Sequence, residues 1–252
     1  MIKSYLTYWL KSKKVSTINH SFINRLNVSV FNKLQLVNDS KIVGYKNRLK
    51  QNKLILNITD LGAGSKKNKS NSRSVQSIAK NVSISPKFGK LLNNLIETFN
   101  CETVIELGTS LGVGTSYLAL SNKTKVFTIE GCPKISEFTQ QQLSDTTNVS
   151  FFVGEFSTQL DAVLKQSGQP NLVYIDGNHT YEGTITYFNY FLKHSQPNAI
   201  LVFDDIHWDK GMEKAWQEIV ASEKVKISLD LFRMGVVFLD ENLDKKHFNL
   251  KF

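Results

Sequence analysis

Cysteine is scarce in this 252-residue chain, and long apolar runs are missing near its start. The two cysteines, Cys101 and Cys132, exclude a disulfide framework and a zinc site built from cysteines. Residues 5–10 form the longest apolar run in the first segment, which is too short for a signal-peptide core or a membrane span. Because hydrophobic residues still make up 41% of the chain, disorder throughout is also excluded. We therefore expect a folded protein in a reducing cytoplasm.

Acidic residues are nearly missing from the first third of the chain. Residues 1–90 carry 18 Lys and Arg against only Asp39 and Asp60, a net charge of +16, whereas residues 91–252 have a net charge of −7. Such a basic segment fits an anionic partner, a cap that docks on the acidic remainder, or a solvated face. Nucleic acid stays open as a partner because electrostatic binding needs no motif, although no basic, aromatic-rich module is evident.

The chain divides by pattern into a basic extension, residues 1–85, and a larger part, residues 86–252. Hydrophobic residues in the first 50 positions recur at three- and four-residue spacings, which predicts amphipathic helices. The rest of the extension is expected to hold, in order, a short strand at 53–60, a loop at 61–73 and a helix at 74–80. Pro86 then opens a further helix.

From Thr103 onward, short β-branched runs alternate with helical stretches. The predicted strands are 103–107, 126–130, 149–153, 172–176 and 199–203, followed by a hairpin of 225–232 and 235–240. The predicted helices are 113–122, 134–145, 157–167, 180–194 and 209–222. This rhythm indicates an α/β, doubly wound, mostly parallel seven-stranded sheet that ends in an antiparallel hairpin, with a helical extension before it.

A glycine-rich loop follows the first of these strands, and an acid ends the second. Glycines let the backbone turn sharply and approach a ligand, and Glu130 stands where an acid accepts hydrogen bonds from a ribose. The sequence lacks G-x-G-x-x-G and a Tyr-x-x-x-Lys pair, which argues against an NAD-dependent oxidoreductase on the same fold. That enzyme class remains the alternative for a nucleotide site of this kind.

These residues resemble the class I S-adenosylmethionine-dependent methyltransferases over roughly residues 86–240. The segment Glu106-Leu-Gly108 to Gly112 is similar to the first motif of that superfamily, and the terminal hairpin matches its reversed last strand. The resemblance implies a Rossmann-like methyltransferase fold with S-adenosylmethionine as cofactor. The cofactor-binding residues that it implies are Glu106, Gly108, Thr109, Ser110, Gly112, Glu130, Glu155 and Asp176.

Three acids follow the fourth and fifth predicted strands: Asp176, Asp204 and Asp205. Carboxylates at the ends of neighbouring parallel strands converge on the ligand crevice, and acids so close stay ionised most readily around a divalent cation. Hard oxygen ligands favour Mg²⁺, with Mn²⁺ as an alternative. This pattern resembles the metal-dependent O-methyltransferases of the catechol and macrolide-sugar types, which implies that all three acids bind the metal. In the opposing interpretation Asp176 binds only the cofactor and Asp204 only caps a loop.

Two histidines near these acids, His179 and His207, are the candidate catalytic bases. A neutral imidazole accepts a proton well at neutral pH. Asn178 departs from the sugar-type pattern, in which an acid is usual at that position. Helix capping competes as a role for His179, and packing at the pocket rim competes for His207.

The acceptor is expected to be an oxygen of a small molecule or sugar. The chain lacks an Asp-Pro-Pro-Tyr or Asn-Pro-Pro-Tyr motif, which would resemble enzymes that methylate amino groups of bases. Neither cysteine follows a proline, as the nucleophile for methylation of cytosine at C5 would. A second glycine motif, Asp60-Leu-Gly62-Ala-Gly64, lacks a following apolar helix, so we interpret it as part of a flexible loop or lid. The basic residues of this loop could hold an anionic acceptor: Lys66, Lys67, Lys69 and Arg73. The sequence leaves open whether the chain forms a homo-oligomer.

Overall fold

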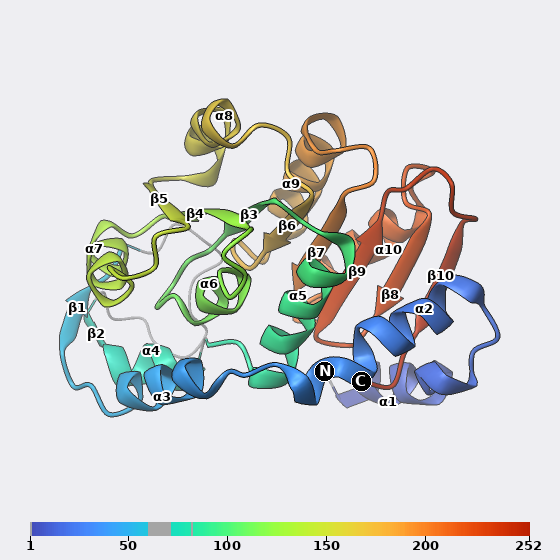
Figure 1. The fold of residues 1–252 in the computed structure, drawn as a ribbon, viewed down its shortest axis with the longest axis horizontal. Helices are drawn as coiled ribbons and strands as arrows, with labels where there is room; N and C mark the ends of the chain where they lie inside the picture. Colours follow the sequence, from blue (N-terminus) through green and yellow to red (C-terminus); the bar gives the residue numbers. More distant parts are fainter. Residues whose placement is uncertain (1, 60–71, 82) are drawn as a thin grey trace.

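The computed structural model describes residues 2–59, 72–81 and 83–252. The predicted second glycine motif and the lysines of the basic loop lie outside these residues. The strands of the main sheet are β3 (Thr103–Leu107), β4 (Lys125–Glu130), β5 (Val149–Val153), β6 (Leu172–Ile175), β7 (Ile200–Asp204), β8 (Ile227–Asp230), β9 (Met234–Phe238) and β10 (Lys246–Asn249). Within the described residues their order across the sheet is β10-β8-β9-β7-β6-β3-β4-β5 (Figure 1).

The sheet confirms the predicted fold class and adds one strand to it. Every pairing is parallel except those of β9, which runs antiparallel to both β7 and β8. The prediction of seven strands was therefore short by one in this sheet. The additional strand, β10, pairs in parallel with β8 at the edge. Edge strands need only one paired side, and this one has two exposed and two half-buried residues, so it carries no apolar run.

Helices cover both faces of the sheet (Figure 1). On one face are α5 (Pro86–Phe99), α6 (Val113–Leu118) and α7 (Pro133–Gln142), and on the other are α8 (Phe156–Ser167), α9 (Tyr181–His194) and α10 (Lys210–Ala221). Local signals set their ends: Pro133 begins α7, Asn100 ends α5 in a left-handed conformation, and the Thr180 side chain accepts a hydrogen bond from the Gly183 amide. None of the helices that the structure describes combines the length and apolar character needed to cross a bilayer.

The basic extension is mostly helical, as predicted, and packs on the same core as the α5–α7 layer. Its elements are α1 (Ile2–Lys11), η1 (Val15–Thr17), α2 (Ser21–Ser29), η2 (Phe31–Leu36), α3 (Ser40–Leu49), β1 (Ile55–Asn57), β2 (Ser72–Ser74) and α4 (Val75–Asn81). At the start of α3 the buried Asp39 accepts a hydrogen bond from Tyr117 and lies 3.0 Å from the Lys90 ammonium. This buried pairing holds the extension against α5 and α6.

The two ends of the described chain meet beside β10. The amide of Lys13 donates to the carbonyl of Asn249 at 2.9 Å, and the amide of Lys251 donates to the carbonyl of Lys13 at 2.8 Å. The hydroxyl of Tyr8 in α1 donates to the carbonyl of Leu250. The segment after α1 thereby extends the sheet edge as an isolated parallel bridge.

The strand order reverses at the centre of the sheet. The chain proceeds from β3 to β4 and β5 on one side, and from β6 to β7 on the other. In sheets of this kind ligands bind in the crevice beyond the carboxyl ends of the strands at such a switch point. The loops after β3 and β6 are therefore the positions at which a ligand site is expected.

Candidate cofactor and active site

A cavity of about 370 Å³ opens at the switch point. Its walls are the loops after four parallel strands, together with Ile58 and Thr59 after β1, Arg73 of β2 and Ile78 of α4. The lining residues are Ile58, Thr59, Arg73, Ile78, Gly108, Ser110, Glu130, Gly131, Cys132, Ile135, Gly154, Glu155, Phe156, Ser157, Asp176, Gly177, Asn178 and Tyr187. The sequence had placed five of these in a cofactor site: Gly108, Ser110, Glu130, Glu155 and Asp176.

Gly108 brings the loops after β3 and β6 into contact. Its φ is +107°, and a Cβ at this position would lie 2.1 Å from the carbonyl oxygen of Asp176. A side chain cannot be accommodated at that distance, and the positive φ disfavours any residue except glycine. The glycine therefore lets two loops that line the cavity come into contact.

Glu130 holds the glycine loop from the end of β4. Its carboxylate accepts one hydrogen bond from the Ser110 amide at 2.8 Å and another from the Cys132 amide at 2.9 Å. Both amides belong to loops that line the cavity, so the carboxylate is oriented before a ligand arrives. Such an acid can then accept hydrogen bonds from a ribose diol.

Three residues of the predicted cofactor set do not line this cavity: Glu106, Thr109 and Gly112. The hydroxyls of Thr109 and Thr128 lie 2.6 Å apart in the interior. A Cβ on Gly112 would lie 2.7 Å from side-chain atoms of Thr139 and Leu143, so packing against neighbouring side chains explains that glycine. For these residues the structure shows support of the glycine loop rather than contact with the cavity.

Glu106 lies beneath the loop and is 1% exposed. Its carboxylate accepts hydrogen bonds from the hydroxyls of Thr115 and Thr128. Burial raises the pKa of Glu106 from 4.5 to about 7, these hydrogen bonds oppose the shift, and the charge of Glu130 adds to it. The acid of the first motif is therefore a buried group beneath the glycine loop.

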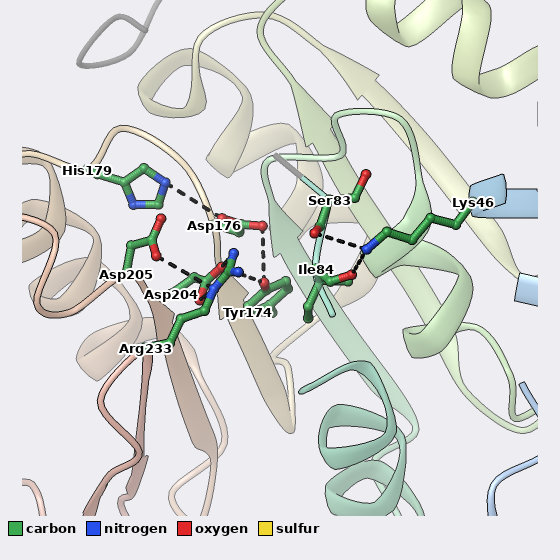
Figure 2. A network of polar contacts seen from close by, with 9 residues as sticks. All are labelled: Lys46, Ser83, Ile84, Tyr174, Asp176, His179, Asp204, Asp205 and Arg233. Carbon is green, nitrogen blue, oxygen red and sulfur yellow. Dashed lines mark hydrogen bonds and ion pairs between the residues drawn. The ribbon is translucent and has the colours of Figure 1, made fainter. Parts of the chain in front are cut away.

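The three predicted metal ligands lie together at the carboxyl ends of β6 and β7, with Arg233 among them (Figure 2). The guanidinium donates to both carboxylate oxygens of Asp204, from Nε at 3.2 Å and from Nη2 at 3.0 Å. The same Nε lies 3.6 Å from a carboxylate oxygen of Asp205. The hydroxyl of Tyr174 donates to Asp176 at 3.1 Å and to Asp204 at 3.4 Å. We call Asp176, Asp204, Asp205 and Arg233 the acid–arginine cluster.

The electrostatics of the acid–arginine cluster follow from its burial. Burial raises the pKa of Asp176 well above its ordinary value, and the charges of Asp204 and Asp205 add to this effect. Burial and Asp204 likewise raise the pKa of Asp205, whereas Arg233 lowers both pKa values. Arg233 thus supplies the positive charge that three neighbouring carboxylates require.

A divalent metal does not fit the acid–arginine cluster as it stands. Both oxygens of Asp204, whose side chain is fully buried, are already hydrogen-bonded to the guanidinium. Over the described part of the chain, no group of three His, Cys, Asp or Glu side chains is arranged to hold a metal ion. The predicted Mg²⁺ or Mn²⁺ site is therefore not supported by the side-chain geometry, and we derive no chemical step from it.

The two predicted bases occupy different places. His179 Nε2 lies 3.6 Å from a carboxylate oxygen of Asp176, next to the acid–arginine cluster. His207 Nε2 lies 2.9 Å from Asp230, and its ring stacks on Phe232. His207 faces a separate cavity between α1 and α10, whereas His179 lies next to Asp176, which lines the cavity at the switch point.

Two basic residues that the sequence interpretation did not assign to the site lie at or near it. Arg233 precedes β9, and Lys46 projects from α3 toward the acid–arginine cluster, donating hydrogen bonds to the carbonyls of Ser83 and Ile84 (Figure 2). Burial and the positive charges of Lys50 and Arg233 lower the pKa of Lys46. Arg73, which the sequence had linked to an anionic acceptor, lines the cofactor cavity itself.

Comparison with known proteins shows which proteins this chain is similar to. Residues 105–206 match the profile of a family described as a methyltransferase domain. A catechol O-methyltransferase of Niastella koreensis is 26% identical over 131 residues, which cover 50% of this chain and 58% of that protein. The chain thus spans less than two thirds of the length of this curated relative.

Solved structures show the same fold over most of the chain. The O-methyltransferase TomG from Streptomyces achromogenes, in complex with S-adenosylmethionine, aligns with a TM-score of 0.61 at 18% identity, covering 88% of this chain and 100% of that one. Cofactor-bound Rv0187 from MTB aligns with a TM-score of 0.62 at 18% identity, covering 84% and 95%. These likenesses confirm the predicted fold, and over residues 105–206 the chain is similar to a methyltransferase domain, as the sequence motifs predicted.

Proposed function

We propose that this protein transfers the methyl group of S-adenosylmethionine to a hydroxyl oxygen of a small molecule. The observation that carries the proposal is the cavity at the switch point, which joins the glycine loop, Glu130 and Asp176 in one site. Each of these groups lies at the carboxyl end of a different parallel strand, which is where ligands bind in such sheets.

The cavity suggests roles for several of its lining residues. Glu130 binds the ribose hydroxyls, the backbone at Gly108 and Ser110 faces the methionine part, and Asp176 accepts from its ammonium group. Glu155, after β5, contacts the adenine. Phe156 adds an apolar surface beside Gly177, where a Cβ would lie 2.8 Å from its ring.

The methyl transfer itself is a single displacement. The acceptor oxygen attacks the methyl carbon, the carbon–sulfur bond breaks, and S-adenosylhomocysteine leaves. The proton of the acceptor hydroxyl passes to His179, whose ring is positioned beside Asp176. Holding the acceptor in line with the sulfonium is the main contribution that the protein can make to such a step.

Another cavity, next to the acid–arginine cluster, suits the entry of the acceptor, and we call it the aromatic cavity. This cavity of about 440 Å³, between α1 and the β8–β9 turn, is lined by aromatic rings and by the cations Arg233 and Lys251. The aromatic residues are Tyr5, Tyr8, Trp9, Phe88, Phe232 and Phe252. An acceptor with an aromatic ring and a negative charge suits this lining.

The first test is calorimetric titration of the protein with S-adenosylmethionine and with S-adenosylhomocysteine. We expect one site per chain and at least tenfold weaker binding in Glu130→Ala. Glu137→Ala is the matched control, because Glu137 is an exposed acid on α7 that pairs only with exposed Lys134 in the contacts described. Absence of binding at millimolar cofactor would overturn the proposal.

The second test is a screen for the acceptor. The release of S-adenosylhomocysteine is measured with a panel of catechols, hydroxylated aromatic acids and sugars. A ligand at a hundred times its dissociation constant also stabilises the fold by about 2.7 kcal/mol, so each positive compound can be checked by thermal melting.

A further inference from the structure

Arg233 is fixed beside the acids by the pairing of two strands. In the antiparallel register of β7 and β9, Asp204 stands opposite Met234, the residue after Arg233. The amide of Ile206 donates to the carbonyl of Arg233 at 3.2 Å. Because the backbone on both sides of the pair is held in this way, the guanidinium is anchored next to the ends of β6 and β7.

The backbone conformation at Asp204 and Asp205 also directs their side chains toward this guanidinium. Asp204 is the last residue of β7, and its side chain is fully buried. Asp205 adopts a left-handed conformation with φ of +52°, which turns it out of the strand direction. A buried carboxylate requires a partner of opposite charge, and a guanidinium matches its two oxygens with two parallel N–H donors.

We propose that Arg233, and not a divalent metal ion, is the resident cation of this acid cluster. The inference rests on the proposed function, in which the cluster lies where the acceptor meets the sulfonium methyl group. The guanidinium keeps its charge at all physiological pH values and cannot serve as a base. It therefore holds the carboxylates in place and provides a fixed positive charge near the acceptor oxygen, while proton removal falls to another group.

The position of Arg233 between two cavities supports a role in placing the acceptor. Its side chain remains 35% exposed although it pairs with two acids. It lines the aromatic cavity beside α1, and Asp176, in the same cluster, lines the cofactor cavity. A metal ion bound by the three carboxylates would have to compete with the guanidinium for the oxygens of Asp204.

The deciding experiment measures metal binding rather than turnover. The wild-type protein, with S-adenosylhomocysteine present, is titrated with Mn²⁺, and free Mn²⁺ is followed by electron paramagnetic resonance. We expect no stoichiometric binding at millimolar Mn²⁺. One Mn²⁺ bound per chain, lost in Asp205→Asn, would overturn the inference without affecting the cofactor titration that tests the proposed function.

A charge-removing variant completes the test. Arg233→Met leaves the three carboxylates without their cation, so we expect it to bind one Mn²⁺ at least tenfold more tightly than wild type and to melt at a higher temperature when Mn²⁺ is added. Lys224→Met is the matched control, because it removes an exposed cation that pairs with the exposed Glu241. If Arg233→Met folds but gains no Mn²⁺ affinity, the role assigned to Arg233 is wrong; if it does not fold, the wild-type titration decides alone.

Discussion

The hydroxyl of Tyr45 donates a 2.8 Å hydrogen bond to the carbonyl of Leu111. Tyr45 belongs to α3 of the basic extension, whereas Leu111 lies in the glycine loop that forms one wall of the cofactor cavity. Both residues are buried, so this bond is shielded from water. The extension is therefore mechanically linked to the loop for which we propose cofactor binding.

Removing that hydroxyl should weaken both the fold and the cofactor site. We expect Tyr45→Phe to lower the free energy of unfolding by about 1 kcal/mol, since a buried carbonyl loses its donor, and to weaken S-adenosylmethionine binding a few-fold. Urea titration and calorimetry measure the two effects. Tyr181→Phe, which removes an exposed bond to Glu218, is the control and should change neither. Equal effects in the two variants would contradict the link.

Stability should depend on pH through Glu106. Its pKa is raised from 4.5 to about 7 in the folded protein. Below pH 4.5 the Glu106 carboxyl group is protonated in both the folded and the unfolded state. Between pH 4.5 and 7 it is protonated only in the folded state, so the free energy of unfolding falls as pH rises through this range. The full loss is about 3 kcal/mol by the usual conversion of a pKa shift to free energy.

Glu106→Gln removes this ionisation while keeping a side chain of the same shape. We expect the variant to melt above the wild type at pH 8 and to lose that advantage toward pH 5, apart from effects common to both proteins. A constant difference in melting temperature across this range would show that Glu106 is not the group responsible.

Gly108 should tolerate no side chain. The contact with the Asp176 carbonyl and the φ of +107° together predict that Gly108→Ala lowers the free energy of unfolding by roughly 2–4 kcal/mol and weakens cofactor binding more than tenfold. Gly168→Ala is the control, because Gly168 also has a positive φ of +69°, but a Cβ at that position would meet no atom within 4 Å. It should cost only about 1 kcal/mol and leave cofactor binding unchanged.

The two histidines should separate in kinetics. His179→Gln removes the proposed base beside Asp176, and we expect kcat to fall roughly 100-fold or more with the acceptor found in the screen. His207→Gln alters a residue in the cavity between α1 and α10, and kcat should stay within about twofold of wild type. A larger loss in His207→Gln than in His179→Gln would reverse the assignment of the base.

Sequence reasoning located the sheet well because its central strands are buried on both faces. Runs such as Leu172–Ile175 are apolar throughout, so their position can be predicted from composition alone. The strand Lys246–Asn249 has no such run, and its pairing with β8 at the edge carries no local signal. Predicted helices were one to four residues longer at some ends for the usual reason that helix ends have weak signals.

The site was harder to predict where side-chain direction decides the role. Glu106 and Leu107 are neighbours in β3, but they face opposite sides of the sheet. The order of residues in the motif does not show which of them faces the ligand. Arg233 was missed because it is distant in sequence from Asp204. The available signal was the predicted hairpin itself, since a reversed strand beside the fifth parallel strand brings its first residues next to Asp204.

The bridge between Lys13 and Leu250 sets an order of events during synthesis. Chains generally begin to fold from the amino-terminal side as they leave the ribosome. Here the segment after α1 must wait for residues 249–251 before its backbone partners exist. The aromatic cavity beside α1, which is lined in part by Phe232, Lys251 and Phe252, is thus completed only once these residues have been synthesised.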